Sequence, residues 1–309
     1  MSAMRATSLF LWCAALLLAG CAGINTPVVK LEQYFGEPQT FDYQGLKINY
    51  YEAGQGPPVM LLHGFGACAY TWRHLAPPLA QAHRVYVIDL KGFGYSDKPA
   101  DGKYAVADQA EMVAAFIQAR DLKDLAVVGH SMGGAVALIT YFKLRESDPA
   151  RINKLVLIDS AGYRQKMPWF IRFARMPLVG RVGGRLLSPR LISYLVLRRC
   201  YHNDDKITDA QIDTYAYFSS LPGAREAVMA TARQLVPDDI DALTAQYKTI
   251  RVPVLVIWGA EDKVVPLEVG KKFERDIPGA KLVILPQCGH IPPEEEEQAT
   301  TRLVVDFLQ

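Results

Sequence analysis

The sequence predicts an α/β fold in which a mostly parallel central sheet is flanked by helices and carries a helical insertion. Short, continuously apolar runs, typical of buried parallel strands, recur along the chain and are separated by helix-length segments. Residues 163–236 break this pattern, because they read as helical segments with few strand-like runs. We therefore expect one sheet built from two stretches of chain, residues 41–162 and 237–309, with a helical cap between them.

The first of these stretches begins with a strand over residues 46–52, followed by apolar runs at 59–62 and 85–90. Two further apolar runs, at 125–128 and 155–159, complete it. Because predicted strands precede and follow the run at 125–128, we expect this run to form a central strand of the sheet.

Residues 129–134 read Gly-His-Ser-Met-Gly-Gly and join the run at 125–128 to an apolar helix. Glycines permit the crowded backbone of a sharp strand-to-helix turn, and such a turn leaves the hydroxyl of Ser131 projecting above a helix N-terminus. A G-x-S-x-G turn in this setting is typical of a nucleophile elbow, which predicts that Ser131 is the nucleophile. The alternative is that Ser131 only caps the helix that follows it.

Two predicted strands of the second stretch, residues 254–258 and 282–285, end in loops that carry Asp262 and His290. A serine hydroxyl becomes a good nucleophile when a base takes its proton and a carboxylate orients that base. We therefore predict that Asp262 is the acid and His290 the base. Asp159, at the end of an earlier strand, is the rival for the role of the acid.

The order Ser131, Asp262, His290 is that of the alpha/beta-hydrolase superfamily, which the chain resembles from about residue 41 to its C-terminus. Three further segments are similar to motifs of this family: residues 63–66 (His-Gly-Phe-Gly), 89–97 (Asp-Leu-Lys-Gly-Phe-Gly-Tyr-Ser-Asp) and 258–262 (Trp-Gly-Ala-Glu-Asp). The resemblance implies an alpha/beta-hydrolase fold whose helical cap covers the serine and lines the substrate pocket.

The resemblance also implies an oxyanion hole, formed by the backbone N–H groups of Phe65 and Met132. Two such donors stabilise the negative charge that develops on a carbonyl oxygen during acyl transfer. By the same resemblance, His63 shapes the oxyanion loop and does not transfer a proton.

The nucleophile indicates the reaction class. Haloalkane dehalogenases and epoxide hydrolases share the fold but attack with a carboxylate, so Ser131 argues against both. We expect hydrolysis of a carboxylic ester, on a small and apolar ester or acyl substrate, through an acyl-enzyme intermediate and without a cofactor or a metal. A carbon–carbon bond hydrolase of the meta-cleavage type is the main alternative, because residues 258–290 resemble theirs. A membrane-tethered binding protein without activity is another.

The N-terminus reads as an export signal, in which Arg5 precedes an apolar run over residues 9–19. This run is too short to span a bilayer, so we expect residues 1–20 to be cleaved as a lipoprotein signal peptide. Leu-Ala-Gly-Cys resembles the bacterial lipoprotein box, which implies that Cys21 is lipidated; Ala22 favours the outer membrane, facing the periplasm. An ordinary secretory peptide is the alternative. We expect residues 21–40 to form a tether.

The charge balance excludes a general preference for nucleic acid, because 34 basic and 32 acidic residues leave a net charge of only +2. The cap segment 164–199 is locally basic, with no acidic residue and several aromatic ones. This composition suits an anionic lipid surface, or arginines that surround a buried apolar face. The acidic run 294–297 is interpreted as the opening of the last helix. Cys68, Cys200 and Cys288 are an odd number, and a bond between Cys68 and Cys288 stays open.

Overall fold

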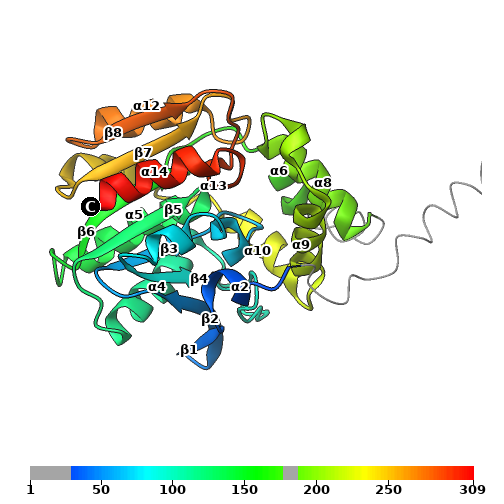
Figure 1. Cartoon of the computed structure of the whole chain (residues 1–309), viewed down its shortest axis with the longest axis horizontal. Helices are drawn as coiled ribbons and strands as arrows, with labels where there is room; N and C mark the ends of the chain where they lie inside the picture. The colour runs from blue at the N-terminus through cyan, green and yellow to red at the C-terminus, as the bar shows by residue number, and fades with distance from the viewer. Residues whose placement is uncertain (1–28, 177–186) are drawn as a thin grey trace, which may run out of the picture.

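The structure is a computed structural model, and it describes residues 29–176 and 187–309 (Figure 1). The signal peptide over residues 1–20 and the acylation of Cys21 lie outside the described residues and stay predictions. Within the described ranges, we find no helix with the length and hydropathy needed to cross a bilayer.

An eight-stranded sheet forms the centre of the molecule, with the strand order β1-β2-β4-β3-β5-β6-β7-β8. The first two strands and the β2–β4 pair are antiparallel, and all other neighbours are parallel, so the predicted mostly parallel sheet is confirmed. The strands are β1 (Gln39–Tyr43), β2 (Leu46–Ala53), β3 (Pro58–Leu62), β4 (Arg84–Ile88), β5 (Leu125–His130), β6 (Ile152–Ile158), β7 (Val254–Gly259) and β8 (Lys281–Leu285).

Helices cover the sheet because its central strands are apolar on both faces. Every residue of β5 and of β7 is buried, as expected for parallel strands between helical layers. Helices α4 and α5 pack against each other, as do α3 and α14, while α12 packs on β7. Their bounds are α3 (Ala76–Leu79), α4 (Val106–Ala119), α5 (Met132–Arg145), α12 (Leu267–Asp276), α13 (Pro292–Glu295) and α14 (Glu297–Leu308).

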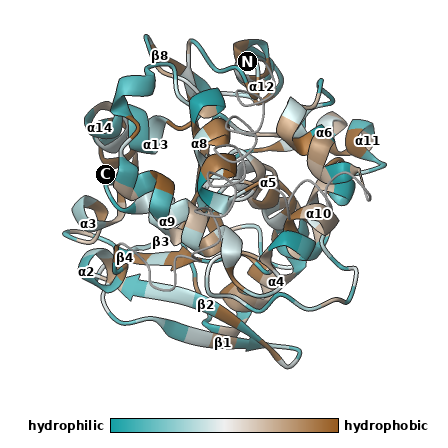
Figure 2. Ribbon diagram, turned by 90° about the vertical axis from the view of Figure 1, so that its right-hand side faces the viewer, coloured by the Kyte–Doolittle hydropathy of each residue, from teal (hydrophilic) through white to brown (hydrophobic). Residues whose placement is uncertain are grey.

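The insertion between β6 and β7 forms a helical cap at one end of the sheet (Figure 1). Its described residues form no strand, and its helices are α6 (Trp169–Arg175), α8 (Pro189–Cys200), α9 (Asp209–Ser220), α10 (Ala224–Gln234) and α11 (Ile240–Ala245). Side-chain caps begin two of them: Ser188 accepts the N–H of Leu191, and Thr208 forms a capping box with Gln211. In Figure 2, which views the molecule from the cap side, α6 and α8 face the reader.

The predicted tether over residues 21–40 is wrong for its second half. A helical turn, α2 (Glu32–Phe35), brings Leu31 and Phe35 to one side, and each is only 1% exposed in the core. The Phe35 ring packs on the ring of Tyr51, with 5.2 Å between the centroids. The sheet then begins at Gln39 and not at residue 46. The two apolar residues, four positions apart, fix this segment to the core.

Candidate active site

The turn that carries Ser131 has a strained backbone. Ser131 lies between β5 and α5 with φ +53° and ψ −118°, a conformation that residues with side chains rarely adopt. Glycines surround it because nothing larger fits: a Cβ on Gly129 would lie 2.5 Å from the carbonyl oxygen of Gly133. A Cβ on Gly133 would overlap the carbonyl oxygen of Leu62. The serine is therefore held at the end of a central strand by close backbone packing.

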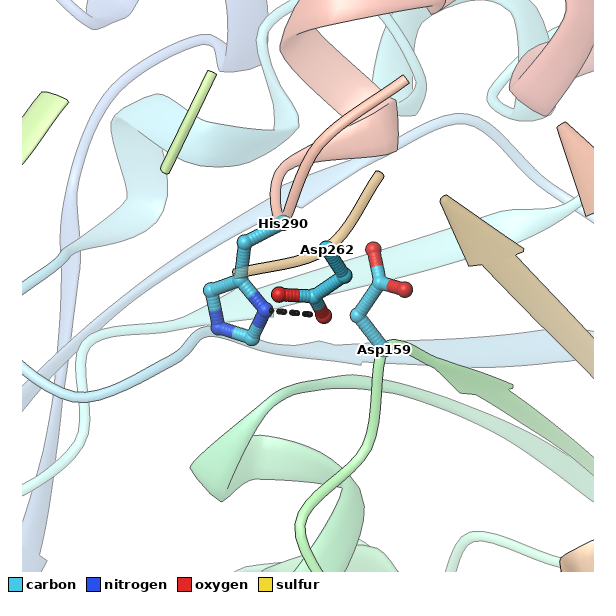
Figure 3. Close-up of side chains that lie close together, drawn as sticks. All are labelled: Asp159, Asp262 and His290. Atoms are coloured by element: carbon cyan, nitrogen blue, oxygen red, sulfur yellow. Dashed lines mark hydrogen bonds and ion pairs between the residues drawn. The ribbon is translucent and has the colours of Figure 1, made fainter. Parts of the chain in front are cut away.

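The structure brings the three predicted catalytic side chains together. The imidazole Nε2 of His290 lies 3.0 Å from Oγ of Ser131, and its Nδ1 lies 2.7 Å from Oδ2 of Asp262 (Figure 3). The side chain of Asp262 is fully buried, and that of His290 is 6% exposed. The other carboxylate oxygen of Asp262 accepts the N–H groups of Val264 and Val265, at 2.7 and 2.9 Å. This arrangement is that of a nucleophile, a base and an orienting acid.

Asp159, the rival acid, lies beside Asp262 and, in the part of the chain that the structure describes, makes no hydrogen bond with His290 (Figure 3). Its Oδ1 accepts the N–H of Gly259 at 2.9 Å. Burial, and to a smaller extent the neighbouring Asp262 carboxylate, raise the pKa of Asp159 well above its usual range, which favours the protonated form of this carboxyl. Asp159, Asp262 and His290 are also the described group closest to a metal-binding arrangement, with ligand atoms within 4.8 Å of one another. Because His290 Nδ1 already bonds to Asp262, and the raised pKa of Asp159 favours its protonated form, these donors suit a proton-transfer site better than a metal.

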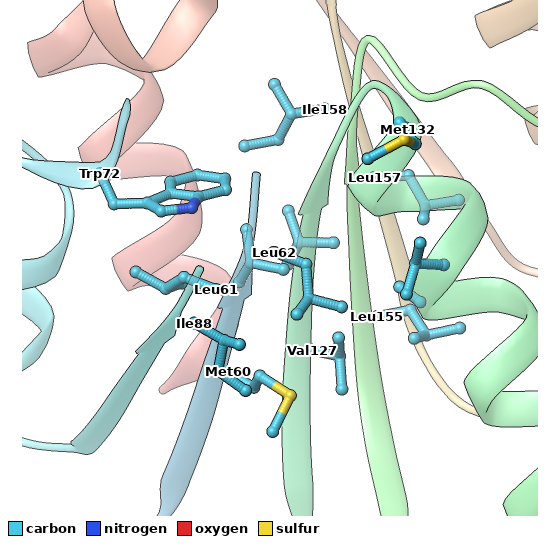
Figure 4. Close-up of a cluster of buried hydrophobic side chains, with 14 of the residues drawn as sticks. Met60, Leu61, Leu62, Trp72, Ile88, Val127, Met132, Leu155, Leu157 and Ile158 are labelled. Atoms are coloured by element: carbon cyan, nitrogen blue, oxygen red, sulfur yellow. The ribbon is translucent and has the colours of Figure 1, made fainter. Parts of the chain in front are cut away.

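The loop after β3 contains the predicted oxyanion donor Phe65. Nε2 of His63 accepts the N–H of Leu90 at 3.0 Å, while its Nδ1 lies 2.8 Å from the carbonyl oxygen of Gly64. Burial lowers the pKa of His63, which stays neutral and ties this loop to the end of β4. Met132, the other predicted donor, is the first residue of α5, where a backbone N–H has no acceptor within the helix. Its side chain is buried among apolar residues at the ends of the strands (Figure 4).

Sequence reasoning missed His130, which is 3% exposed beside the nucleophile. Its Nε2 lies 2.7 Å from the backbone carbonyl oxygen of His290, so Nε2 carries the proton and donates. Burial, with a smaller contribution from His290, lowers the pKa of His130 to about 3. A neutral His130 therefore fixes the backbone of the base.

Glu295 connects the cap to the loop of the base. Its carboxylate accepts the N–H groups of His202 at 2.8 Å and Asn203 at 2.7 Å in the cap, and that of Gly289 at 2.6 Å beside His290. The N–H of His290 in turn donates to the carbonyl oxygen of Cys200. One buried carboxylate thus holds the end of α8 and the loop of the base together.

Glu294 forms a second connection. It pairs with the buried guanidinium of Arg73 at 2.8 Å and accepts the hydroxyl of Tyr215 at 2.5 Å. Gln211 donates to the same carboxylate at 3.2 Å. The interpretation of residues 294–297 as a helix opening is therefore incomplete: Glu294 and Glu295 are buried in α13, and α14 begins only at Glu297. Apart from Gly289, which lies six positions from Glu295, the partners of these two carboxylates lie about 80 to 220 positions away, so no local pattern indicates them.

A cavity of about 290 Å³ opens beside Ser131 and His290, between the core and the cap. Apolar cap residues form most of its wall, and among its described lining residues Arg225, half-buried, is the only one with a permanent charge. A smaller cavity of about 50 Å³ lies against Ser131, Phe65 and Met132. The apolar wall includes Phe170, Ile171, Phe173, Ile192, Val196 and Met229.

The three described cysteines, Cys68, Cys200 and Cys288, are buried and free. The bond between Cys68 and Cys288 that the sequence left open is therefore absent from the structure.

The chain is similar to known hydrolases in sequence and in structure. A family model described as the alpha/beta hydrolase fold matches residues 57–297. An uncharacterised hydrolase, YugF, of Bacillus subtilis is 30% identical, with 87% of this chain and 97% of the relative covered. The 2-hydroxymuconate semialdehyde hydrolase of Pseudomonas putida is 30% identical, with 85% and 91% covered. The crystal structure of a meta-cleavage product hydrolase from Pseudomonas fluorescens is 28% identical, with a TM-score of 0.75 and 89% and 98% covered.

Proposed function

Because the chain belongs to the alpha/beta hydrolase fold family, we propose that it is a serine hydrolase that cleaves a carbon–carbon bond next to a ketone. The observation that carries this proposal is the similarity, over 85% of the chain, to an enzyme named for 2-hydroxymuconate semialdehyde hydrolysis. The comparisons favour this alternative over the ester hydrolysis that we expected first.

In the proposed reaction, Oγ of Ser131 attacks the ketone carbon of a vinylogous 1,5-diketone while His290 takes its proton. The backbone N–H groups of Phe65 and Met132 bind the oxyanion of the tetrahedral intermediate. When the intermediate collapses, the carbon–carbon bond breaks and its electron pair passes into the enolate fragment. That fragment takes the proton from His290, and the acyl group stays on Ser131.

Water then completes the cycle. His290 removes a proton from water, the hydroxide attacks the acyl carbon, and the proton returns to Oγ of Ser131 as the carboxylic acid leaves. Asp262 keeps the imidazole in the tautomer with the proton on Nδ1 and stabilises its charged form, through the 2.7 Å contact. The core residues therefore supply each proton transfer that the reaction needs.

Besides these proton transfers, such a substrate needs a cation for its carboxylate, and Arg225 can supply it. Dienoic acids combine an apolar body with a carboxylate, and a carboxylate in an apolar cavity needs a cation. Since Arg225 is the permanently charged residue among the described lining residues, we propose that it binds this carboxylate while the apolar wall takes the rest of the substrate.

The test compares two substrates on one enzyme: a 2-hydroxy-6-oxo-dienoate, followed by the loss of its absorbance, and a neutral p-nitrophenyl ester. We expect a higher kcat/KM for the dienoate. Arg225→Gln should lower kcat/KM for the dienoate roughly 10- to 100-fold, through KM, because a charge-assisted hydrogen bond contributes about 1.5–3 kcal/mol. The same change should leave turnover of the neutral ester nearly unaffected, and Arg225→Lys should recover part of the loss. Faster turnover of the ester, with no effect of Arg225→Gln, would contradict this proposal.

Ester hydrolysis is the second candidate, and the apolar wall of the 290 Å³ cavity favours it. The same serine, histidine and aspartate would cleave a carboxylic ester through the same acyl-enzyme intermediate. A preference for the aryl ester in the comparison above would select it.

A further inference from the structure

The cap carries a cluster of exposed apolar side chains. Among the described residues, eight large hydrophobic side chains are exposed, and six of them lie on α6 and α8 or directly beside these helices. Both helices lie on the face of the molecule that Figure 2 presents. We call this cluster the cap rim: Trp169, Met176, Leu187, Leu191, Tyr194 and Leu195.

Half of the cap rim also lines the large cavity. Trp169, Leu187 and Leu195 are exposed to solvent and also line the cavity next to Ser131. Single exposed apolar residues scattered over a surface are ordinary, whereas an exposed apolar cluster marks a surface that binds another molecule.

The charges around the rim differ from the sequence-based expectation. Arg190 pairs with Asp209 and Asp213 of α9, and Arg198 pairs with Asp204, so much of the positive charge of α8 is neutralised. Helix α6 has no acidic residue and carries two arginines, Arg172 and Arg175, next to Trp169. The alternative of a buried apolar face fits Ile171 and Leu197 but not the six exposed residues of the rim.

We propose that the cap rim docks on a phospholipid bilayer, with Trp169 inserted at the level of the headgroups and the cavity opening toward the lipid. A tryptophan suits this level because its ring is apolar and its N–H is polar. Arg172 and Arg175 are placed to bind anionic headgroups at the same depth.

The chain's own N-terminal sequence supports a membrane as the occupant. Val29, the first described residue, lies eight positions after Cys21, the predicted acylation site. Fully extended, eight residues span at most about 28 Å. An acyl anchor at Cys21 would therefore hold Val29, and the core that it enters, within about 28 Å of a bilayer surface.

Tryptophan fluorescence tests the docking directly. A chain that begins at Ala22 contains all described residues, hence the whole sheet, the triad and the described cap helices, but has neither the apolar leader nor an anchor. It holds three tryptophans, and Trp72 and Trp258 are fully buried, so quenching by lipid reports on Trp169. With vesicles of phosphatidylcholine and phosphatidylglycerol that carry brominated acyl chains, we expect roughly a third of the emission to be lost, since one of the three tryptophans meets the lipid. Trp169→Phe should abolish this quenching.

Matched variants distinguish binding through the cap rim from non-specific binding of the protein to vesicles. Leu191 and Tyr194 are exposed on α8 and do not line the cavity, whereas Ile284 is equally exposed on β8. Leu191→Gln combined with Tyr194→Gln should weaken vesicle co-sedimentation several-fold, and Ile284→Gln should not. Turnover of a soluble ester checks that each variant is folded. Absent quenching, equal binding of the two variants, or a rim that instead joins two copies of the chain in analytical ultracentrifugation would overturn the proposal.

Discussion

Different interactions form the core half and the cap half of the site. In the core, Ser131, Asp262 and His290 are held by hydrogen bonds of 2.7 to 3.0 Å. The cap contributes apolar side chains, several of them exposed, and the half-buried Arg225. The difference teaches that the core determines the chemistry, through fixed hydrogen-bond geometry, and that the cap determines what is bound, through contacts that tolerate substitution. Five substitutions, with Glu296→Gln as a control, test the core half of this division, from the largest expected effect to the smallest.

Ser131→Ala removes the nucleophile and should lower kcat on the order of 10⁶-fold, as in a comparable serine enzyme, with little change in substrate binding. Burst kinetics and labelling by a fluorophosphonate would both be lost. Residual labelling of this variant would assign the nucleophile to another residue and contradict the role of the core triad in the chemistry.

Asp262→Asn should lower kcat by about 10⁴-fold, because the imidazole loses the carboxylate that selects its tautomer. Asp159→Asn, at the neighbouring carboxyl, should change kcat by less than about threefold, because the raised pKa of Asp159 favours its neutral form and His290 bonds to Asp262 instead. Its raised pKa means that the unfolded state releases a proton that the folded state keeps, so Asp159 costs stability above pH 4. Urea unfolding at pH 7 should therefore find Asp159→Asn at least as stable as the parent, and a destabilised variant would contradict a neutral Asp159.

Glu295→Gln tests the connection between the halves. An amide cannot accept N–H groups on both sides, so either the cap or the loop of His290 loses its partner. We expect kcat to fall about 10- to 100-fold, with a smaller change in KM, because a small displacement of the base slows proton transfer. If Glu295 only stabilised the fold, Glu295→Gln would lower the melting temperature and leave the pH–rate profile unchanged. Glu296→Gln is the control, because Glu296 forms an exposed pair with Lys206 and should have little effect.

His130 should make stability fall with acid. Its pKa is about 3 in the folded protein and about 6.5 in the unfolded chain, so only the unfolded chain gains a proton as the pH falls below 6.5. This difference amounts to about 2 kcal/mol at pH 5. His130→Asn should show a shallower loss of unfolding free energy between pH 7 and pH 5, measured by urea titration. Identical slopes would place the proton uptake elsewhere.

The sequence predicted the triad because each of its residues follows an apolar strand in a recognisable local pattern. Glu295 has no such pattern: in an acidic run it looks solvated, and only the folded chain brings the N–H groups of His202 and Gly289 to it. Leu31 and Phe35 were missed for a different reason, since one helical turn is too short to give a clear period. The exposure of the cap rim also depends on packing between helices, which local patterns do not report.

The ribosome synthesises the nucleophile of this site long before the base and the carboxylates that hold the cap. Ser131 is translated about 160 positions before His290, Glu294 and Glu295. A nascent chain with its nucleophile in place still lacks the base, and its cap lacks the carboxylates that fasten it to the core. Hydrolytic activity therefore starts only after these residues are translated, and a chain that stops before Gly289 is inert although its first strands can already fold.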